Sequence, residues 1–397
     1  MMKRIGVLTT GGDAPGQNSC LKILVSLAVD AGLEVIGFRK GWEGLLRIDL
    51  DHPESQADNA MALTKARVRD IDRQAGSFLH SSRLVPGSVP MAELPPHLKP
   101  LSAQADTLDL TAHILKVAQH LDIDTFVLMG DSASLTYAAR LSKEGLPIIA
   151  IPKTVHNDVA GSDYSLGFST SLATGVRFVH EVRAMAGSRE EIAVVEMFGR
   201  NFGLTTLLIG ALSGADRVLI PETPFDPEQL AQLLAEDQRI NPNNYAILVM
   251  SEAICFTPEK ADRYLPAERE GNPSSFPFSV GSQRSIGAGA GGSGAFLTEV
   301  LENLLGQRLL YQPLSYLLRA GYPDGQDLLG AYNFASLAVD LLKAGKSGRL
   351  VAYRRGENYV DLPLETVTLG EGNINVGEHY DQRTYRAKPT LMWATRI

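Results

Sequence analysis

Only two cysteines, Cys20 and Cys255, occur among the 397 residues of the chain. They form no paired motif, so the sequence supports neither a disulfide framework nor a cysteine-ligated metal site. Basic clusters are also missing. The formal net charge is −8, and no stretch could neutralise several neighbouring phosphates of DNA or RNA. We therefore expect a small-molecule partner and no nucleic acid.

Long hydrophobic runs are the third absence. No run reaches the roughly 18 apolar residues that cross a bilayer, which predicts that no membrane is involved. The first apolar run, from Ile5 to Leu8, is too short to be the hydrophobic region of a secretion signal. With so few cysteines, these features predict a cytoplasmic location.

What is present is an ordinary globular composition, with 44% hydrophobic and 21% charged residues, over a length that allows two or three lobes. Short apolar runs alternate with amphipathic stretches, a pattern typical of parallel strands joined by crossover helices. This predicts an α/β fold. The expected strands are 5–8, 34–38, 125–129, 147–151, 192–197, 217–220 and 245–251.

Other segments are expected to be helical or irregular. A helix is predicted over 169–186, where apolar residues recur on one face. The proline-rich stretch 86–100 is predicted to be an extended surface excursion. The polar and then glycine-rich stretch 256–294 could be a lid, an interface arm or an insertion.

A glycine-rich turn runs from Gly11 to Gly16, between the first predicted strand and a helix. Such a turn offers backbone N–H groups and a helix N-terminus to an anion. The alternative is a tight turn that only needs glycine torsions. A dinucleotide-binding dehydrogenase is disfavoured, because no Gly-x-Gly-x-x-Gly motif follows the first strand. That spacing does occur at Gly287, Gly289 and Gly292, but in a polar stretch with no apolar strand before it.

The complete string from Gly6 to Asn18 is more specific, and it resembles the opening signature of the phosphofructokinase family. Further segments resemble motifs of this family in the same order along essentially the whole chain: GWEGL at 41–45, GSFLHSSR at 76–83, PKTVHND at 152–158, FGRN at 198–201, SE at 251–252 and LSYLLRAG at 314–321. The resemblance implies two Rossmann-like three-layer lobes with the active site in the cleft between them. It assigns 1–167 to a donor lobe, 168–317 to a sugar-phosphate lobe and 318–397 to a C-terminal segment returning across both.

The same resemblance implies an activity. The chain would transfer a phosphoryl group from pyrophosphate, or less favourably ATP, to fructose 6-phosphate or a related sugar phosphate. It would use Mg²⁺ and work as a homodimer or homotetramer. Such chemistry requires a base near the acceptor hydroxyl, a metal at the donor phosphates and cations around the transferred group.

The catalytic segment departs from the family pattern. His156 stands where the family carries the acidic base, while Thr154 and Asp158 are retained, and Arg200 is the implied cation at the transferred group. An imidazole with its ordinary pKa near 6.5 could accept a hydroxyl proton. It is also bulkier than a carboxylate and directed differently. A working base and an inactive site therefore both remain open.

The implied donor site consists of Gly11, Gly12, Arg83, Gly130 and Lys153. In the family, a lysine directly before the catalytic threonine accompanies pyrophosphate, because an ammonium can occupy the space of the missing nucleoside. Lys153 therefore favours pyrophosphate, and a solvated surface lysine is the alternative.

The implied metal ligand depends on the alignment. It is Asp131 if one residue is inserted. Without a gap, the position falls on Ser132 and the next one on Ala133.

The implied sugar-phosphate site consists of Phe198, Gly199, Glu252, Tyr316 and Arg319. Two arginines of the family are replaced, one by Glu191 and the other by Leu310, which would weaken binding of fructose 6-phosphate or shift the preferred acceptor. Together with Ser132 and His156, these replacements support a second hypothesis, a paralogue that binds a phosphorylated ligand without turnover as a regulatory subunit or sensor.

Overall fold

A computed structural model describes residues 3–99, 105–200, 202–264, 285–286, 293–367 and 375–390. The chain forms two compact units, one of residues 1–170 and 319–371 and the other of residues 171–318 and 372–397. The C-terminal segment thus contributes first to one unit and then to the other. The glycine cluster at 287–292, and most of the stretch expected to be a lid or insertion, lie outside the described residues.

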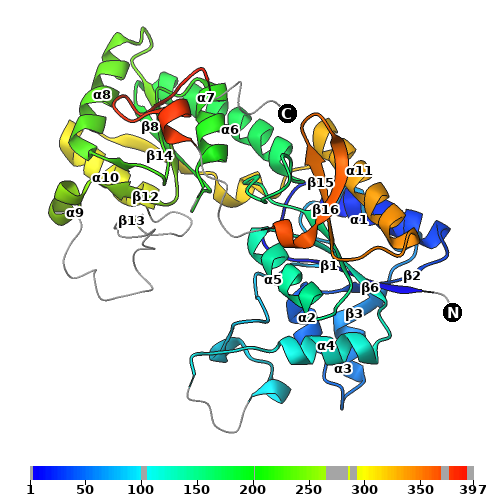
Figure 1. Ribbon diagram of the computed structural model, residues 1–397. Coiled ribbons are helices and arrows are strands. Elements are labelled where there is room, and N and C mark those ends of the chain that lie inside the picture. The colour runs from blue at the N-terminus through cyan, green and yellow to red at the C-terminus, as the bar shows by residue number, and fades with distance from the viewer. Residues whose placement is uncertain are drawn as a thin grey trace. The chain divides into compact units, whose positions relative to one another are not determined.

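The first unit contains a seven-stranded sheet in the order β16-β15-β7-β6-β1-β2-β3 (Figure 1). Its strands are β1 (Arg4–Thr9), β2 (Glu34–Phe38), β3 (Ala60–Ala62), β6 (Thr125–Gly130), β7 (Ile148–Pro152), β15 (Arg349–Arg354) and β16 (Asn358–Pro363). Its helices are α1 (Gln17–Asp30), α2 (Trp42–Leu46), α3 (Glu54–Asn59), α4 (Thr111–His120), α5 (Ser132–Lys143) and α11 (Gly325–Lys343). The neighbours β15, β7, β6, β1 and β2 run parallel, while β3 and β16 pair antiparallel at the two edges.

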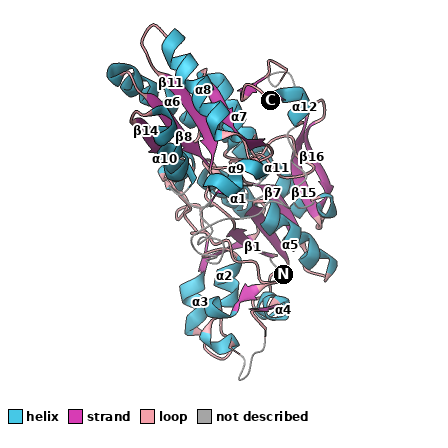
Figure 2. Cartoon of the chain, turned by 90° about the vertical axis from the view of Figure 1, so that its left-hand side faces the viewer, coloured by secondary structure: helices cyan, strands magenta, loops and turns pink. Residues whose placement is uncertain are grey.

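Helices cover both faces of this sheet. Helices α1 and α11 lie side by side on one face. On the other face lie α2, α4 and α5 (Figure 2). They enclose a core that includes Trp42, Ile114 and Leu135. Residues along each strand alternate between the two faces, so both sets must be apolar. The central strands therefore have the continuous apolar sequences from which they were predicted.

The strand order has one switch point. From β1 the chain moves to β2 on one side, and later returns to β6 on the other side of β1. The loops that leave the carboxyl ends of β1 and β6 therefore diverge, which is where open parallel sheets bind ligands. The Gly11–Gly16 turn follows β1, and Asp131 follows β6.

The second unit has a parallel sheet in the order β14-β8-β11-β9, formed by β8 (Ile192–Met197), β9 (Arg217–Leu219), β11 (Ala246–Ser251) and β14 (Leu309–Pro313). Its longer helices are α6 (Phe168–Arg189), α7 (Leu204–Ser213), α8 (Pro227–Ile240) and α10 (Ser293–Leu305). Smaller elements are β10 (Pro224–Phe225), β12 (Ile254–Phe256), β13 (Ser285–Ile286), α9 (Pro258–Tyr264), α12 (Val376–His379), β17 (Tyr380–Asp381) and β18 (Arg386–Ala387).

The expected elements are found with small shifts at their ends, but one expectation needs correction. The proline-rich stretch is not simply an extended excursion. It contains β4 (Val89–Pro90), which pairs with β5 (Thr107–Leu108), and two short 3₁₀ turns, Met91–Glu93 and Pro96–Leu98. Val89 and Leu94 are buried in the core. Strands β14, β15 and β16 were not predicted. Strands β14 and β16 mix polar and apolar residues on half-buried surfaces, and β15 buries only a short apolar centre, 350–352, between two arginines.

A buried carboxylate fixes the segment that precedes α6. Asp327, on α11, is fully buried and accepts hydrogen bonds from the Tyr164 hydroxyl (2.5 Å), the Gly167 N–H (2.7 Å), and the N–H (2.9 Å) and hydroxyl (2.5 Å) of Thr170. Gly167 in turn packs against the Gly11–Gly16 turn, since a Cβ built on it would lie 2.6 Å from the Ala14 Cβ. The carboxylate thus links α11 to the loop after β1.

Replacing Asp327 with alanine would leave several buried donors without an acceptor. We expect Asp327→Ala to lower the free energy of unfolding by about 3–5 kcal/mol in chemical denaturation. The control is Asp340→Ala on the same helix, where an aspartate that is 66% exposed pairs with Lys343. We expect this control to cost less than about 0.5 kcal/mol. Equal stability of the two variants would contradict the anchoring role.

Candidate active site

The Gly11–Gly16 turn needs glycine for more than its torsions. Gly11 and Gly16 have φ values of 76° and 86°, in the left-handed region. In addition, a Cβ on Gly11 would lie 2.1 Å from Asp131 Oδ2, and a Cβ on Gly12 would lie 2.5 Å from Arg319 Nη1. The turn therefore closes directly onto a carboxylate and a guanidinium, which a simple connecting turn would not require.

Hydrogen bonds hold this turn against the segment 76–83. The Gly11 N–H donates to the Ser82 carbonyl (2.9 Å), and the Ser81 hydroxyl donates to the Gly11 carbonyl (2.6 Å). Asn18, at the start of α1, accepts from the Phe78 N–H and donates to the Gln74 carbonyl, both at 2.9 Å. Two motifs far apart in the sequence thus form one loop cluster. Ser81, Ser82 and Asn18 lie within the family-like motifs of the sequence but were not predicted as site residues.

Three cations surround Gly12. Lys153 is fully buried and donates from Nζ to the Gly12 carbonyl (2.5 Å). Arg83 Nη2 lies 3.3 Å from the Cβ position of Gly12, and Arg319 lies closer still. A solvated surface lysine is therefore excluded. Predicted donor residues Gly11, Gly12, Arg83 and Lys153 do come together, and Gly130 ends the adjacent strand β6, bonded through its carbonyl to the Lys153 N–H.

Burial lowers the pKa of Lys153 to about 8, because desolvation penalises the ammonium. The carboxylates of Asp131 and Asp13 act in the opposite direction, while the neighbouring guanidiniums lower the pKa further. The ammonium therefore loses its proton within an accessible pH range.

His156 lies beside Arg319 in the same unit. Its backbone N–H donates to the Thr154 hydroxyl oxygen (3.1 Å), and its ring Nε2 lies 3.2 Å from Arg319 Nη2. A guanidinium can only donate, so Nε2 is the acceptor and the neutral ring carries its proton on Nδ1. Burial first, and then the Arg319 charge, lower the pKa of His156 to about 3. The side chain is a neutral imidazole at working pH.

Two carboxylates are candidate ligands for a metal ion. Asp131 caps α5, its Oδ1 accepting from the N–H (3.1 Å) and hydroxyl (2.7 Å) of Ser134. Asp158 is linked to the start of α5, because the Ser132 hydroxyl donates to its carbonyl (2.9 Å). Its Oδ1 is buried without a hydrogen-bond partner among the described residues, and burial, with a contribution from Asp131, raises its pKa.

In the part of the chain that the structure describes, no three or more acidic, histidine or cysteine side chains gather as a complete metal site. Mg²⁺, however, commonly uses only one or two protein carboxylates and completes its shell with water and substrate phosphates. Asp131 and Asp158 fit that pattern, with the unpartnered Asp158 oxygen as the specific indication.

The predicted sugar-phosphate residues of the second unit gather at the carboxyl edge of its sheet. Phe198 and Gly199 follow β8, Glu252 follows β11, and Tyr316 follows β14. Arg200, predicted as the cation at the transferred group, also follows β8. Arg200 Nε lies 3.6 Å from Oε1 of the buried Glu252, and the Phe198 and Tyr316 rings meet edge to face at 5.4 Å. A half-exposed arginine and a buried carboxylate can together bind phosphate oxygens and hydroxyls.

Three further predicted positions lie in different parts of the chain. Arg319 belongs to the first unit, where it lies against Gly12 and His156. Glu191 directly precedes β8, and Leu310 pairs with Ala193 near the start of that strand. Both replaced arginine positions therefore lie toward the amino edge of the sheet, away from Arg200 and Glu252 within this unit.

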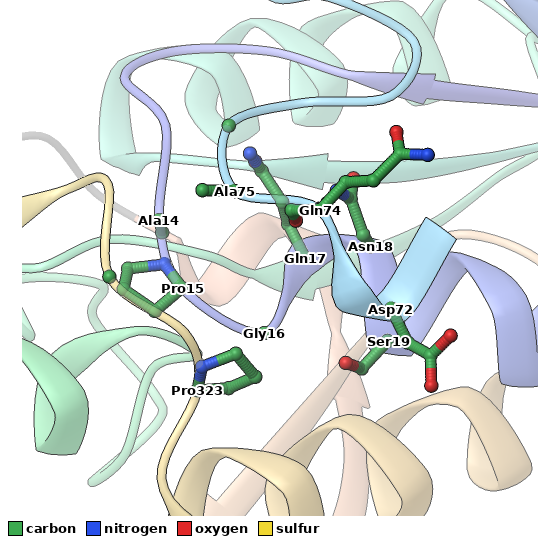
Figure 3. A pocket seen from close by; sticks show the side chains of 12 residues that line it. Ala14, Pro15, Gly16, Gln17, Asn18, Ser19, Asp72, Gln74, Ala75 and Pro323 are labelled. Atoms are coloured by element: carbon green, nitrogen blue, oxygen red, sulfur yellow. The ribbon is translucent and has the colours of Figure 1, made fainter. Parts of the chain in front are cut away.

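A small polar pocket lies at the start of α1 (Figure 3). Gln17, Asn18 and Ser19 contribute to it from the helix, and Asp72 and Pro323 from other segments. None of the predicted site residues lines it. The loop cluster thus lines part of this pocket, but the predicted donor residues do not.

Comparison with known proteins finds similar sequences and structures. The model of the family described as phosphofructokinase matches residues 4–342. The ATP-dependent 6-phosphofructokinase of Streptococcus pyogenes is 31% identical over 363 residues, which cover 91% of this chain and 88% of the relative. That of Streptococcus equi subsp. zooepidemicus is 30% identical over 390 residues, 96% of each chain.

Solved structures show the same fold. The pyrophosphate-dependent phosphofructokinase from Marinobacter aquaeolei matches with a TM-score of 0.74 at 18% identity, over 99% of this chain and 91% of its own. The T-state phosphofructokinase of Pichia pastoris matches with a TM-score of 0.68 at 21% identity, over 92% of this chain and 37% of its own. Each unit described above is thus part of a phosphofructokinase fold. No helix among the described residues combines the length with the apolar character that a membrane span requires.

The environment of His156 predicts its titration. We expect its ring to remain neutral, with the proton on Nδ1, from about pH 5 to pH 8 in histidine-labelled NMR spectra. His52 is the internal control, because its hydrogen bond to Asp49 raises its pKa above the ordinary value. His156→Gln identifies the resonance. A His156 signal that titrates near pH 6.5 would contradict this description.

Proposed function

The chain belongs to the phosphofructokinase family, and we propose that it transfers a phosphoryl group from pyrophosphate to the hydroxyl of fructose 6-phosphate or a related sugar phosphate. The supporting observation is the set of three cations around Gly12. Lys153, Arg83 and Arg319 bring positive charge to a loop at the switch point of a parallel sheet. A diphosphate carries several negative charges in a small volume, and such a set of cations suits it.

The buried lysine supports pyrophosphate in particular. Lys153 places its ammonium against the Gly12 carbonyl, inside the loop cluster. Phosphoryl transfer depends mainly on positioning and on charge stabilisation, both of which a fixed cation supplies. We propose that Lys153 neutralises the donor and that Thr154, His156 and Asp158 surround the transferred group, with His156 or Asp158 near the acceptor hydroxyl.

For the acceptor, we propose the cluster of the second unit. Glu252 would accept hydrogen bonds from sugar hydroxyls, and Arg200 would contact phosphate oxygens. The Phe198 and Tyr316 rings would provide an apolar wall for the sugar, since they already contact each other there. Arg319 would serve the transferred group, in keeping with its place beside Gly12.

Mg²⁺ would be held by Asp131 and Asp158. It would neutralise charge on the donor phosphates. The oligomer proposed from the family resemblance is a homodimer or homotetramer, and the scarcity of cysteine supports a cytoplasmic location.

A specific observation favours each of two alternatives. ATP as the donor is favoured by the curated relatives near 30% identity, which are named ATP-dependent. A binding paralogue without turnover is favoured by His156, because its acceptor nitrogen is engaged by Arg319.

A coupled assay with Mg²⁺ and fructose 6-phosphate tests the donor. We expect pyrophosphate to exceed ATP in kcat/KM by about 10-fold or more, and Lys153→Met to reduce the pyrophosphate value by about 100-fold or more. Lys143→Met removes an exposed lysine and should leave activity unchanged. Higher activity with ATP would support the first alternative, and no turnover with either donor would support the second.

The pH profile tests Lys153 separately. The ammonium loses its proton as pH rises through its pKa of about 8, so kcat/KM for pyrophosphate should fall above that pH. Lys153→Arg keeps the positive charge at all accessible pH values, and any activity it retains should lack this alkaline decline. An identical decline in Lys153→Arg would assign the titration to another group.

A further inference from the structure

We infer that His156 is a positioning residue for Arg319 and not the base of the transfer step: its ring holds the guanidinium over the Gly11–Gly12 turn. This inference rests on the proposed function, since it assigns roles within the same site. It concerns a position where the chain departs from the family pattern, so the role cannot be taken over from relatives.

Arg319 is held at two ends of its guanidinium. Nη1 donates to the Asp13 carbonyl (3.2 Å), and Nη2 donates to His156 Nε2 (3.2 Å). The side chain is almost completely buried, with 9% of the residue exposed. Its Nη1 occupies the space that a Cβ on Gly12 would need. The cation is therefore fixed directly above the turn that the donor would approach.

The ring geometry conflicts with a role as base. A neutral imidazole has one acceptor nitrogen, and a general base must present that lone pair to the hydroxyl. In His156 the acceptor is Nε2, which faces Arg319, and the other nitrogen, Nδ1, is buried. Accepting a proton at Nε2 would break the bond to Arg319 and place two positive charges in contact.

The loop that carries His156 is held by its own contacts. The His156 N–H donates to the Thr154 hydroxyl oxygen (3.1 Å) within the loop that follows β7. The neighbouring Asn157 has a φ of 55°, so the chain turns sharply directly after the ring. A fixed loop and a fixed ring can in turn fix a long arginine side chain, which otherwise has many rotamers.

Within the segment 152–158, His156 would therefore position a cation rather than transfer a proton. His156 supplies an uncharged acceptor, which leaves the full charge of Arg319 available to the transferred group. A carboxylate at this position would instead form an ion pair with Arg319 and neutralise part of that charge. The histidine thus supports a preorganised cation, and such preorganisation is a large component of phosphoryl-transfer catalysis.

Three variants separate positioning from proton transfer. Glutamine is the informative substitution, because its side-chain oxygen can reach the Nε2 position and accept from Arg319, but it cannot act as a base at neutral pH. Asparagine is the matched control, because it is also an amide but is too short. We expect His156→Gln to keep kcat within about 3-fold of wild type, and His156→Asn and His156→Ala to lose about 10-fold or more.

A role of His156 as the general base predicts a different result for these variants. If His156 takes the proton, His156→Gln should lose about 10²- to 10⁴-fold in kcat, as much as His156→Ala, and this outcome would overturn the inference. Thermal unfolding of each variant shows whether the protein is folded. A double-mutant cycle with Arg319→Met adds a second test, because His156→Ala should have little further effect on kcat once the guanidinium is gone.

A measurement that needs no turnover, the histidine NMR spectrum, separates this inference from the proposed function. If wild type uses neither pyrophosphate nor ATP, the proposed function fails, and the histidine NMR spectrum decides the inference. We expect Nε2 to be unprotonated in wild type and this tautomer preference to be lost in Arg319→Met. A protonated Nε2 in wild type, or an unchanged spectrum in Arg319→Met, would overturn the positioning role.

Discussion

The close approach of backbone to side chains at Gly11 and Gly12 is the constraint on which the first unit depends. Only a residue without a Cβ leaves room for the Asp131 carboxylate on one glycine and the Arg319 guanidinium on the next. The loops after β1, β6 and β7 and the segment that begins at Arg319 can meet only because this space exists. Glycines, which carry no charge, therefore let the charged groups of the site approach one turn.

Acidic side chains compensate part of the buried positive charge around this turn. Lys153 and Arg319 are nearly or completely buried, and burying such cations is unfavourable unless partners compensate. Asp131 and Asp13 provide part of that compensation for Lys153, and backbone carbonyls accept from both cations. The site is thus an arrangement of opposed charges that a phosphorylated ligand and a cation would enter, rather than a uniformly positive surface.

Structural support for the site comes from elements far along the chain. Asp327 on α11 fixes residues 164–170 by hydrogen bonds, and Gly167 in that segment packs on the loop after β1. In the second unit, the carboxyl ends of β8, β11 and β14 bring Arg200, Glu252 and Tyr316 to one edge of a sheet. The physical reason is the same in both units: parallel strands place their following loops together.

The sequence by itself determined the α/β class, most of the central strands and the close-packed glycine turn after the first strand, because buried parallel strands are continuously apolar and glycine turns mark close approaches. It did not reveal the half-buried strands β14 and β16, or β15, whose short buried centre lies between two arginines. Only the tertiary structure decided the surroundings of individual side chains. It buried Lys153, placed Arg319 against Gly12, and paired Arg319 with His156. These contacts join residues more than a hundred positions apart, and such distances are set by packing, which local sequence patterns do not encode.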